Sequence, residues 1–545
     1  MNNKKLFAIL LTILTLLIGV ILVLTLLLRI NNEQPNSNTL DEKNSLLSNQ
    51  SKIILGGSDP VTMDPHIAGD ASSATYLVEI FGGLVTITPE MEIVLDLAQS
   101  LEVSEDGLIY TFTLRDDIYF HSGRKVTAND VKWSLERAAS PQLNSNTSLS
   151  YLRDIVGFIE RRYGQADEIS GIKVIDNKSI SIQIDAPKAY FLAKLTYPTA
   201  FVVDKNQIEL NPRNWTRKPN GTGPYKLSQW KLGEKIILEA NDRYHLGAGN
   251  VQFIDYQLSG GSILTRFENG EVDMAGVSQN DIDRVRDPSE PLNKLYRQSN
   301  YFQTNYIGMN TTQAPFDDIF VRQAFASSID IGKITDITYK KMLPQATGIL
   351  PPGMYGYDAS KKTFEYNPSF ARELLAKSKY GSAENLPPIV FSDIGAGAEG
   401  STDIQAYIEQ WKQNLGVTVK LRQTDFASFL SDLDNGQLQI YGIGWIMDYP
   451  DPENILDVKF HSSSTENNEN YSNSVVDQLL EDARSETDSD KRAALYQEAE
   501  KIIVSEVPWI PTYFTTGHYV VSEKITKWVE PPMIVPRLRF VEISE

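Results

Sequence analysis

The residues best suited to chemistry in this chain are two aspartates, Asp448 and Asp451, in a proline-rich loop. The loop follows the apolar run 440–444, which has the composition of a buried strand, and precedes the helical pattern at 453–458. Two neighbouring carboxylates can act as general acid and base. A proline-rich loop after a strand is more often the rim of a binding site, so we expect ligand binding here rather than catalysis.

Other patterns for catalysis or metal binding are missing from the sequence. The chain has no cysteine, which excludes disulfides and thiolate metal sites, and none of its five histidines has metal-ligand spacing. It has no G-x-S-x-G nucleophile elbow, and the glycine-rich run 221–225 lacks the ending of a P-loop. We therefore predict no catalytic residue, no metal ligand and no cofactor.

Alternating strands and helices must position the proline-rich loop. Tyr110, Phe112 and Leu114 alternate with threonines, which predicts a strand, and 172–185 reads as a hairpin. From about residue 303 strands and helices alternate, which predicts a parallel sheet covered on both faces. The last long helix, 488–504, precedes an extended segment and a strand at 519–521, a pattern typical of a chain that returns to its first domain.

The N-terminal segment predicts a membrane anchor. Residues 6–28 carry no charge, and about 20 apolar residues suffice to span a bilayer. Lys4 and Lys5 precede the run, so the following chain is expected outside the cytoplasm. We predict a transmembrane signal anchor over 1–30 and a flexible tether over 31–51, which places the protein at the cell membrane with its globular part extracytoplasmic. The alternative is a cleaved signal peptide and a secreted protein.

The net charge of the chain limits the classes of partner that it can bind. The formal net charge is −19, and because the first 30 residues hold three basic groups and no acid, the remainder carries −22. Such a surface repels phosphate backbones and anionic lipid, so nucleic acid is excluded as a partner, and contact with membrane is expected only through the anchor.

Several motifs point to a known family. They are DPVTMDPH at 59–66, a block within 101–137, GTGPYKL at 221–227, a block within 315–324, and GWIMDYPDPEN at 444–454. In this order they resemble the extracytoplasmic solute-binding proteins of the dipeptide/oligopeptide/nickel class of ABC importers, bacterial solute-binding protein family 5. The resemblance extends over residues 52–545.

The resemblance implies an α/β fold of the two-lobed periplasmic-binding-protein type (type II), with three subdomains, that closes on its ligand like a hinge. Lobe I would hold 52–302 plus 513–545, with an extra subdomain at about 80–203. Lobe II would hold 303–512. The strands that cross between the lobes would lie near 301–309 and 509–514.

The resemblance also implies roles for four residues. Asp448 resembles the carboxylate that holds the α-ammonium group of a peptide, and Trp445 would form a wall of the same pocket. Asp59 and Tyr513 would face the cleft from the first-strand exit and the second crossover. Simpler interpretations stay open: a helix cap for Asp448, a core side chain for Trp445, a turn for Asp59 and packing for Tyr513. Oligopeptide-binding relatives carry an arginine where this chain has Gly442, so no clamp for a carboxylate is visible.

These inferences predict a monomeric, membrane-tethered receptor that captures peptides and delivers them to the transmembrane subunits of an ABC permease. A roomy cleft that reads peptides through main-chain hydrogen bonds fits best. The alternatives are the same fold binding another solute, such as a sugar, a polyamine or a metal chelate, or an exported peptide chaperone or enzyme.

Overall fold

The computed structural model describes residues 51–360, 364–395 and 401–544. It forms two units, Met1–Ser51 and Lys52–Glu545. The predicted anchor and tether therefore lie outside the described residues, apart from Ser51. Within the described ranges, no helix combines the length and the apolar character that crossing a membrane requires.

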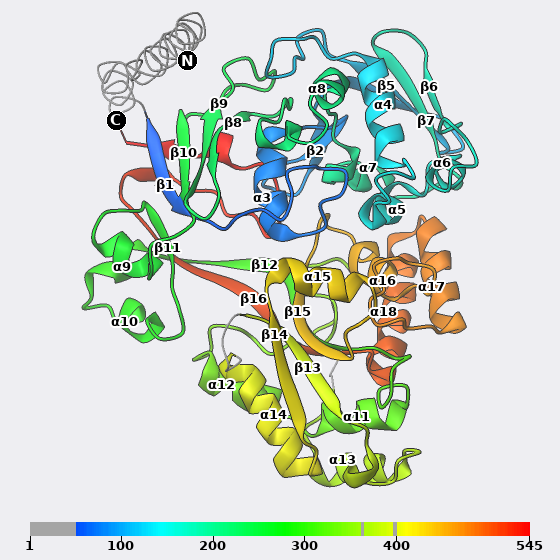
Figure 1. Cartoon of the computed structure of the whole chain (residues 1–545), viewed down its shortest axis with the longest axis vertical. Helices are drawn as coiled ribbons and strands as arrows, with labels where there is room; N and C mark the ends of the chain where they lie inside the picture. Colours follow the sequence, from blue (N-terminus) through cyan, green and yellow to red (C-terminus); the bar gives the residue numbers. More distant parts are fainter. Residues whose placement is uncertain (1–50, 361–363, 396–400, 545) are drawn as a thin grey trace, which may run out of the picture. The chain divides into compact units, whose positions relative to one another are not determined.

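The first sheet of the larger unit has the order β1-β10-β9-β8. β1 (Lys52–Gly56) runs parallel to β10 (Phe253–Gln257), whereas β9 (Lys235–Ala240) and β8 (Tyr225–Lys231) are antiparallel. Helix α3 (Ala71–Ile80) packs against it (Figure 1). The glycine-rich run 221–225 lies at the end of this helix, where the backbone N–H of Gly223 donates to the carbonyl of Ile80 at 2.9 Å. A Cβ at Gly221 would lie 2.0 Å from the same oxygen, so close packing explains the glycines.

The end of the chain completes the core of this first sheet. Leu538 and Val541 are buried in the same cluster as Tyr225 of β8. The carboxylate of Glu79 accepts hydrogen bonds from the backbone N–H groups of Arg537 and Leu538 at 2.7 and 2.9 Å. The C-terminal residues are therefore part of the N-terminal core.

A second, antiparallel sheet has the order β4-β5-β7-β6 and forms what we call the small-sheet region, residues 98–202. Its strands are β4 (Ala98–Val103), β5 (Ile109–Leu114), β6 (Ile172–Val174) and β7 (Ser179–Gln183), and its helices are α4 (Ala128–Ala138), α5 (Asn146–Leu152), α6 (Phe158–Arg162) and α7 (Phe191–Lys194). The predicted strand at 110–114 and the hairpin at 172–185 are confirmed.

The third sheet has six strands in the order β11-β16-β12-β15-β13-β14. They are β11 (Met274–Gly276), β12 (Tyr296–Met309), β13 (Ile389–Ile394), β14 (Val419–Thr424), β15 (Ile440–Ile446) and β16 (Trp509–Val521). The prediction of a parallel sheet is correct for β13, β14 and β15 but wrong for β12 and β16, which pair antiparallel. These two long strands differ because one enters this part of the chain from the first half and the other leads back to it.

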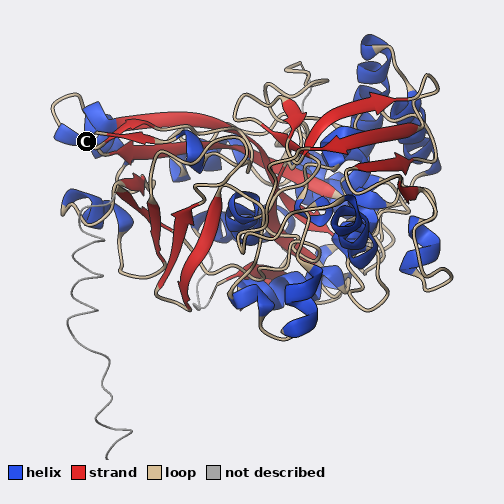
Figure 2. Ribbon diagram, turned by 90° about the horizontal axis from the view of Figure 1, so that it is seen from above, coloured by secondary structure: helices blue, strands red, loops and turns tan. Residues whose placement is uncertain are grey.

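Helices of the second half lie beside this sheet (Figure 1), and Figure 2, seen from above, shows helices and strands interspersed in the described chain. The helices beside this sheet are α11 (Ile319–Ser327), α12 (Ile331–Thr338), α13 (Pro368–Lys377), α14 (Thr402–Leu415), α15 (Phe426–Asp434), α16 (Glu453–Phe460), α17 (Ser474–Ser485) and α18 (Ser489–Glu506). The remaining short strands and α-helices of the described residues are β2 (Val85–Ile87), β3 (Ile93–Leu95), α8 (Lys205–Leu210), α9 (Ile263–Glu268), α10 (Ile282–Arg286), β17 (Ile525–Lys527) and β18 (Glu542–Ile543). The fold is thus a mixed α/β architecture of several sheets.

Candidate functional site

Asp448 lies where two distant parts of the chain meet. Its backbone N–H donates to Oδ1 of Asn454 at 3.0 Å, and its carboxylate accepts a hydrogen bond from the hydroxyl of Tyr151. Tyr151 comes from α5 of the small-sheet region and stacks on Tyr197, with ring centroids 3.9 Å apart. These hydrogen bonds therefore connect Asp448, in the loop after β15, both to Asn454 of α16 and to the small-sheet region.

The surroundings of Asp448 make its protonation state depend on whether a cation lies nearby. Burial raises the pKa of Asp448 to about 7, hydrogen bonds from Tyr151 and Asn454 oppose the rise, and the nearby charge of Glu466 adds to it. A carboxylate in such surroundings is stabilised in its charged form by a nearby cation. The site therefore favours a ligand that brings a positive charge to this oxygen pair.

A cavity of about 230 Å³ opens at Asp448. Residues 69–74 and Tyr197 line it on one side, and α15, β15 and the segment 459–468 line it on the other. Trp445 forms part of the wall, since its indole N–H donates to Oδ1 of Asn454 at 3.1 Å and Lys459 lies 4.6 Å over its ring. The predicted pair Asp448 and Trp445 thus lines one cavity.

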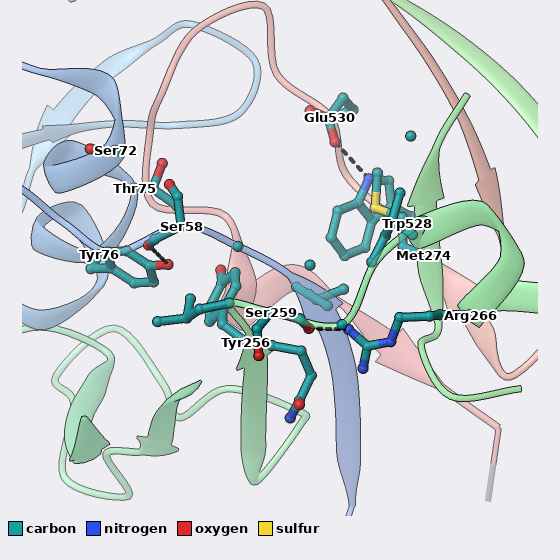
Figure 3. A pocket seen from close by; sticks show the side chains of 18 of the residues that line it. Ser58, Ser72, Thr75, Tyr76, Tyr256, Ser259, Arg266, Met274, Trp528 and Glu530 are labelled. Atoms are coloured by element: carbon teal, nitrogen blue, oxygen red, sulfur yellow. Dashed lines mark hydrogen bonds between the residues drawn. The ribbon is translucent and has the colours of Figure 1, made fainter. Parts of the chain in front are cut away.

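This cavity is the first of three that share walls. A second, of about 210 Å³, shares Ile446 and Ile534 with it. The third, of about 670 Å³, shares Tyr256 and Tyr301 with the second. Figure 3 shows this third cavity, where Arg266 donates to the carbonyl of Ser259 at 2.7 Å. A row of cavities therefore leads from Asp448 to the carboxyl ends of β1 and β10.

The backbone of β15 offers a strand edge beside Asp448. β15 pairs with β12 along its whole length, from Ile440 to Ile446. On its other side it pairs with β13 only at Ile440 and Tyr441. In the described part of the chain, residues 442–446 therefore have no strand on that side, and Gly444–Ile446 line the cavity. An extended peptide can add to such an edge through main-chain hydrogen bonds.

A buried ion cluster joins the small-sheet region to α16. Nζ of Lys194 lies 3.1 Å from Asp154 and 2.8 Å from Glu453. Burial raises the pKa of Glu453 to about 7 against the charge of Lys194. For Asp154 burial acts in the same direction, yet the charges of Lys194 and Lys188 lower its pKa to about 2. In this conformation the cluster connects α16, and with it the loop that carries Asp448, to the small-sheet region.

The second aspartate of the loop has a structural role. Oδ1 of Asp451 accepts a hydrogen bond from the backbone N–H of Glu453 at 3.0 Å, at the start of α16. Both carboxylate oxygens of Asp451 also accept hydrogen bonds from the guanidinium of Arg492, at 2.7 and 2.8 Å. Asp451 therefore serves the helix start, and Asp448 does not cap α16.

The other two predicted residues lie away from this cavity. Asp59 accepts hydrogen bonds from the indole N–H of Trp230 at 2.8 Å and from the backbone N–H of Gly233 at 2.6 Å, both in the β8–β9 hairpin. Tyr513 is part of β16, and its ring packs 5.0 Å from that of Tyr339. Neither is among the described residues that line the three cavities.

Sequence reasoning missed two aromatic residues of the site, Tyr151 and Tyr197. Both belong to segments without a motif, and the hydrogen bond from Tyr151 to Asp448 spans 297 residues of sequence. No local signal could have found them. Across the described residues, no group of three or more histidine, aspartate or glutamate side chains has the arrangement of a metal site.

Comparison with known proteins identifies what this chain is similar to. Residues 92–467 match the model of the bacterial extracellular solute-binding proteins, family 5, middle region. The oligopeptide-binding protein OppA of Bacillus subtilis is 28% identical over 494 residues, which cover 87% of this chain and 89% of OppA.

A solved structure of the Escherichia coli murein tripeptide binding protein MppA is 24% identical, covers 91% of this chain and 99% of its own, and superposes with a TM-score of 0.81. The unliganded open form of the same protein, with 91% and 98% covered, gives 0.65. Both likenesses show the fold.

Proposed function

Since this chain belongs to the family 5 bacterial extracellular solute-binding proteins, we propose that it is the peptide-binding component of an ABC importer. The observation that carries the proposal is the position of Asp448. Its carboxylate lies in a cavity walled by two distant parts of the chain, beside an edge of β15 without a neighbouring strand. An ammonium group and an extended backbone are the two features that a peptide offers to such a site.

In the proposed complex the α-ammonium of the peptide binds Asp448, and its backbone runs along residues 444–446. Trp445 forms the wall next to the first residue. The chain then continues toward the larger cavity, which Arg266 and Arg537 line, together with Glu530, the ion-pair partner of Arg537. The amino end of the peptide thus lies at Asp448, in the first cavity, and its carboxyl end points toward the third cavity.

Binding is coupled to closure of two lobes. We propose the lobes 52–302 plus 513–545 and 303–512, which move about the long strands β12 and β16. Closure brings Tyr151 and Asp448 into contact, so a ligand in the adjoining cavity favours the closed form by as much as it binds that form better.

The same proposal includes the setting of the receptor. Residues 1–30 anchor a monomeric, extracytoplasmic domain at the cell membrane, and the chain binds its cargo without chemical change, in keeping with a family of binding proteins. The delivered peptide passes to the transmembrane subunits of a permease. Cell fractionation tests the anchor: the protein should be found in the membrane fraction with its N-terminal segment intact.

Calorimetry on the purified full chain tests the peptide function. Tripeptides with a free amino group should bind, and their N-acetylated forms should bind about 100-fold more weakly, because truncating one partner of a buried charge pair costs about 2–5 kcal/mol. Asp448→Asn should cause a similar loss. The exposed carboxylate of Glu409 on α14 provides the matched control, Glu409→Gln, which should leave the affinity unchanged. Equal binding of free and acetylated peptides, or binding of sugars, polyamines or chelates instead of peptides, would refute the proposal.

A further inference from the structure

The cavity at Asp448 carries more negative charge than one ammonium group needs. Besides Asp448, the side chains of Asp434 and Glu466 line it, and Lys459 is the one cation among its described lining residues. Asp70 also belongs to the wall, but its carboxylate caps α3 by accepting the backbone N–H of Ser73 at 2.9 Å. Three carboxylates therefore share the surroundings of a single lysine.

The lysine is committed to other groups. Nζ of Lys459 donates to Oδ1 of Asn468 at 2.6 Å and lies 4.6 Å over the ring of Trp445. Burial raises the pKa of Glu466 and of Asp434, the charge of Lys459 lowers both, and Asp434 adds to the rise at Glu466. The two carboxylates are thus close enough to repel each other.

The wall that leads to these carboxylates is apolar. Phe426, Leu430 and Leu433 of α15 line the cavity, and Asp434 ends that helix. An aliphatic stem with a charged head fits such a lane, because lysine and arginine side chains bury their methylene groups along apolar surface and keep the cation at a polar end. A carboxylate-bearing side chain would meet two like charges.

Resting on the peptide-binding function proposed above, we propose that this cavity selects peptides whose first residue is lysine or arginine. Asp448 holds the α-ammonium group, and Asp434 and Glu466 receive the side-chain cation of the same residue. The stem of that residue lies along the apolar face of α15. Asp434 and Glu466 are then specificity-determining residues, whereas Asp448 binds the α-ammonium group of any peptide.

Calorimetry on the full chain with Lys-Ala-Ala, Ala-Ala-Ala and Glu-Ala-Ala tests the proposal. Lys-Ala-Ala should bind about tenfold more tightly than Ala-Ala-Ala, and Glu-Ala-Ala more weakly than either, since an ion pair with Asp434 or Glu466 adds to the affinity and a like charge subtracts from it. In Glu466→Gln and in Asp434→Asn the preference for Lys-Ala-Ala over Ala-Ala-Ala should fall several-fold. The affinity for Ala-Ala-Ala itself should change less than about threefold, which also shows that each variant is folded.

The outcomes separate the two proposals. Equal binding of Lys-Ala-Ala and Ala-Ala-Ala, or a preference that both variants keep, overturns the selection of a basic first residue while the peptide function stands. A parallel loss of both peptides in the variants gives Asp434 and Glu466 a structural role and also overturns it. If none of the three peptides binds, the peptide function fails, and the selectivity fails with it. Glu409→Gln, which removes one exposed negative charge on α14, should leave the preference intact.

Discussion

The affinity for peptides should depend on pH through Asp448. Burial raises the pKa of this carboxyl to about 7, and the groups that face it are Tyr151, Asn454, Glu466 and Lys459. A peptide ammonium binds the ionised form. Below pH 7 the protein must first release the proton from Asp448, and this release weakens the observed affinity.

The size of the effect follows from that pKa. At pH 6 about one molecule in eleven has Asp448 ionised, so binding should be about tenfold weaker than with a fully ionised site. At pH 6.5 each bound peptide should release about 0.8 proton. Above about pH 8 the peptide amino group itself loses its proton, so affinity should pass through a maximum between about pH 7 and 8.

Calorimetry in two buffers with different ionisation enthalpies measures both quantities. The difference in observed heat at pH 6.5 gives the number of protons released, and the binding constants from pH 6 to 8.5 give the profile. Asp448→Asn should abolish the acid limb and leave only the loss above pH 8. Heat that is the same in both buffers, with a flat profile between pH 6 and 7.5, would refute the reasoning, as would an acid limb that persists in the asparagine variant.

Three further predictions concern the stability of the protein and its tryptophan fluorescence. Lys194→Met should lower the free energy of unfolding by about 3–5 kcal/mol in urea denaturation, because it leaves the buried carboxylate of Glu453 without its cation, whereas Asp154 keeps Lys188. Adding Glu453→Gln should restore part of it, and strict additivity would contradict the pairing. Gly221→Ala should cost about 1–3 kcal/mol because its Cβ would lie 2.0 Å from a carbonyl oxygen at the end of α3, whereas Gly276→Ala, whose Cβ meets nothing within 4 Å, should be nearly neutral. Trp445→Phe should remove most of the peptide-induced change in tryptophan fluorescence, and an undiminished change would place the reporting indole elsewhere.

Local patterns predicted elements well where one helix or strand decides its own ends. Gly416 ends α14 at φ 76°, a left-handed conformation that glycine favours, and the strand before Asp448 begins at residue 440, as the apolar run 440–444 predicts. The motif at 444–454 led to Asp448 and Trp445, and these two do share a cavity. Their binding roles remain predictions.

Contacts that depend on the third dimension could not be predicted in this way. The segments 507–514 and 519–521 read as separate pieces, yet they belong to one strand, β16, whose register against β12 shifts twice. Nothing in the sequence around Tyr151 indicates Asp448, since their contact exists only after the small-sheet region and the loop beyond β15 have folded together. Asp59 resembles a cleft residue by its motif but is tied to Trp230 of the neighbouring hairpin.

Leu538 and Val541 are part of the N-terminal core, and we expect this to delay the folding of that core during export. A chain exported from its N-terminus presents the first sheet outside long before its last residues have crossed, so that sheet must wait, with apolar surface uncovered, for the final segment to arrive. We therefore expect the first sheet to be more sensitive to proteolysis before the C-terminal segment has crossed than after it. Trimming the last ten residues should disrupt the beginning of the molecule rather than its end.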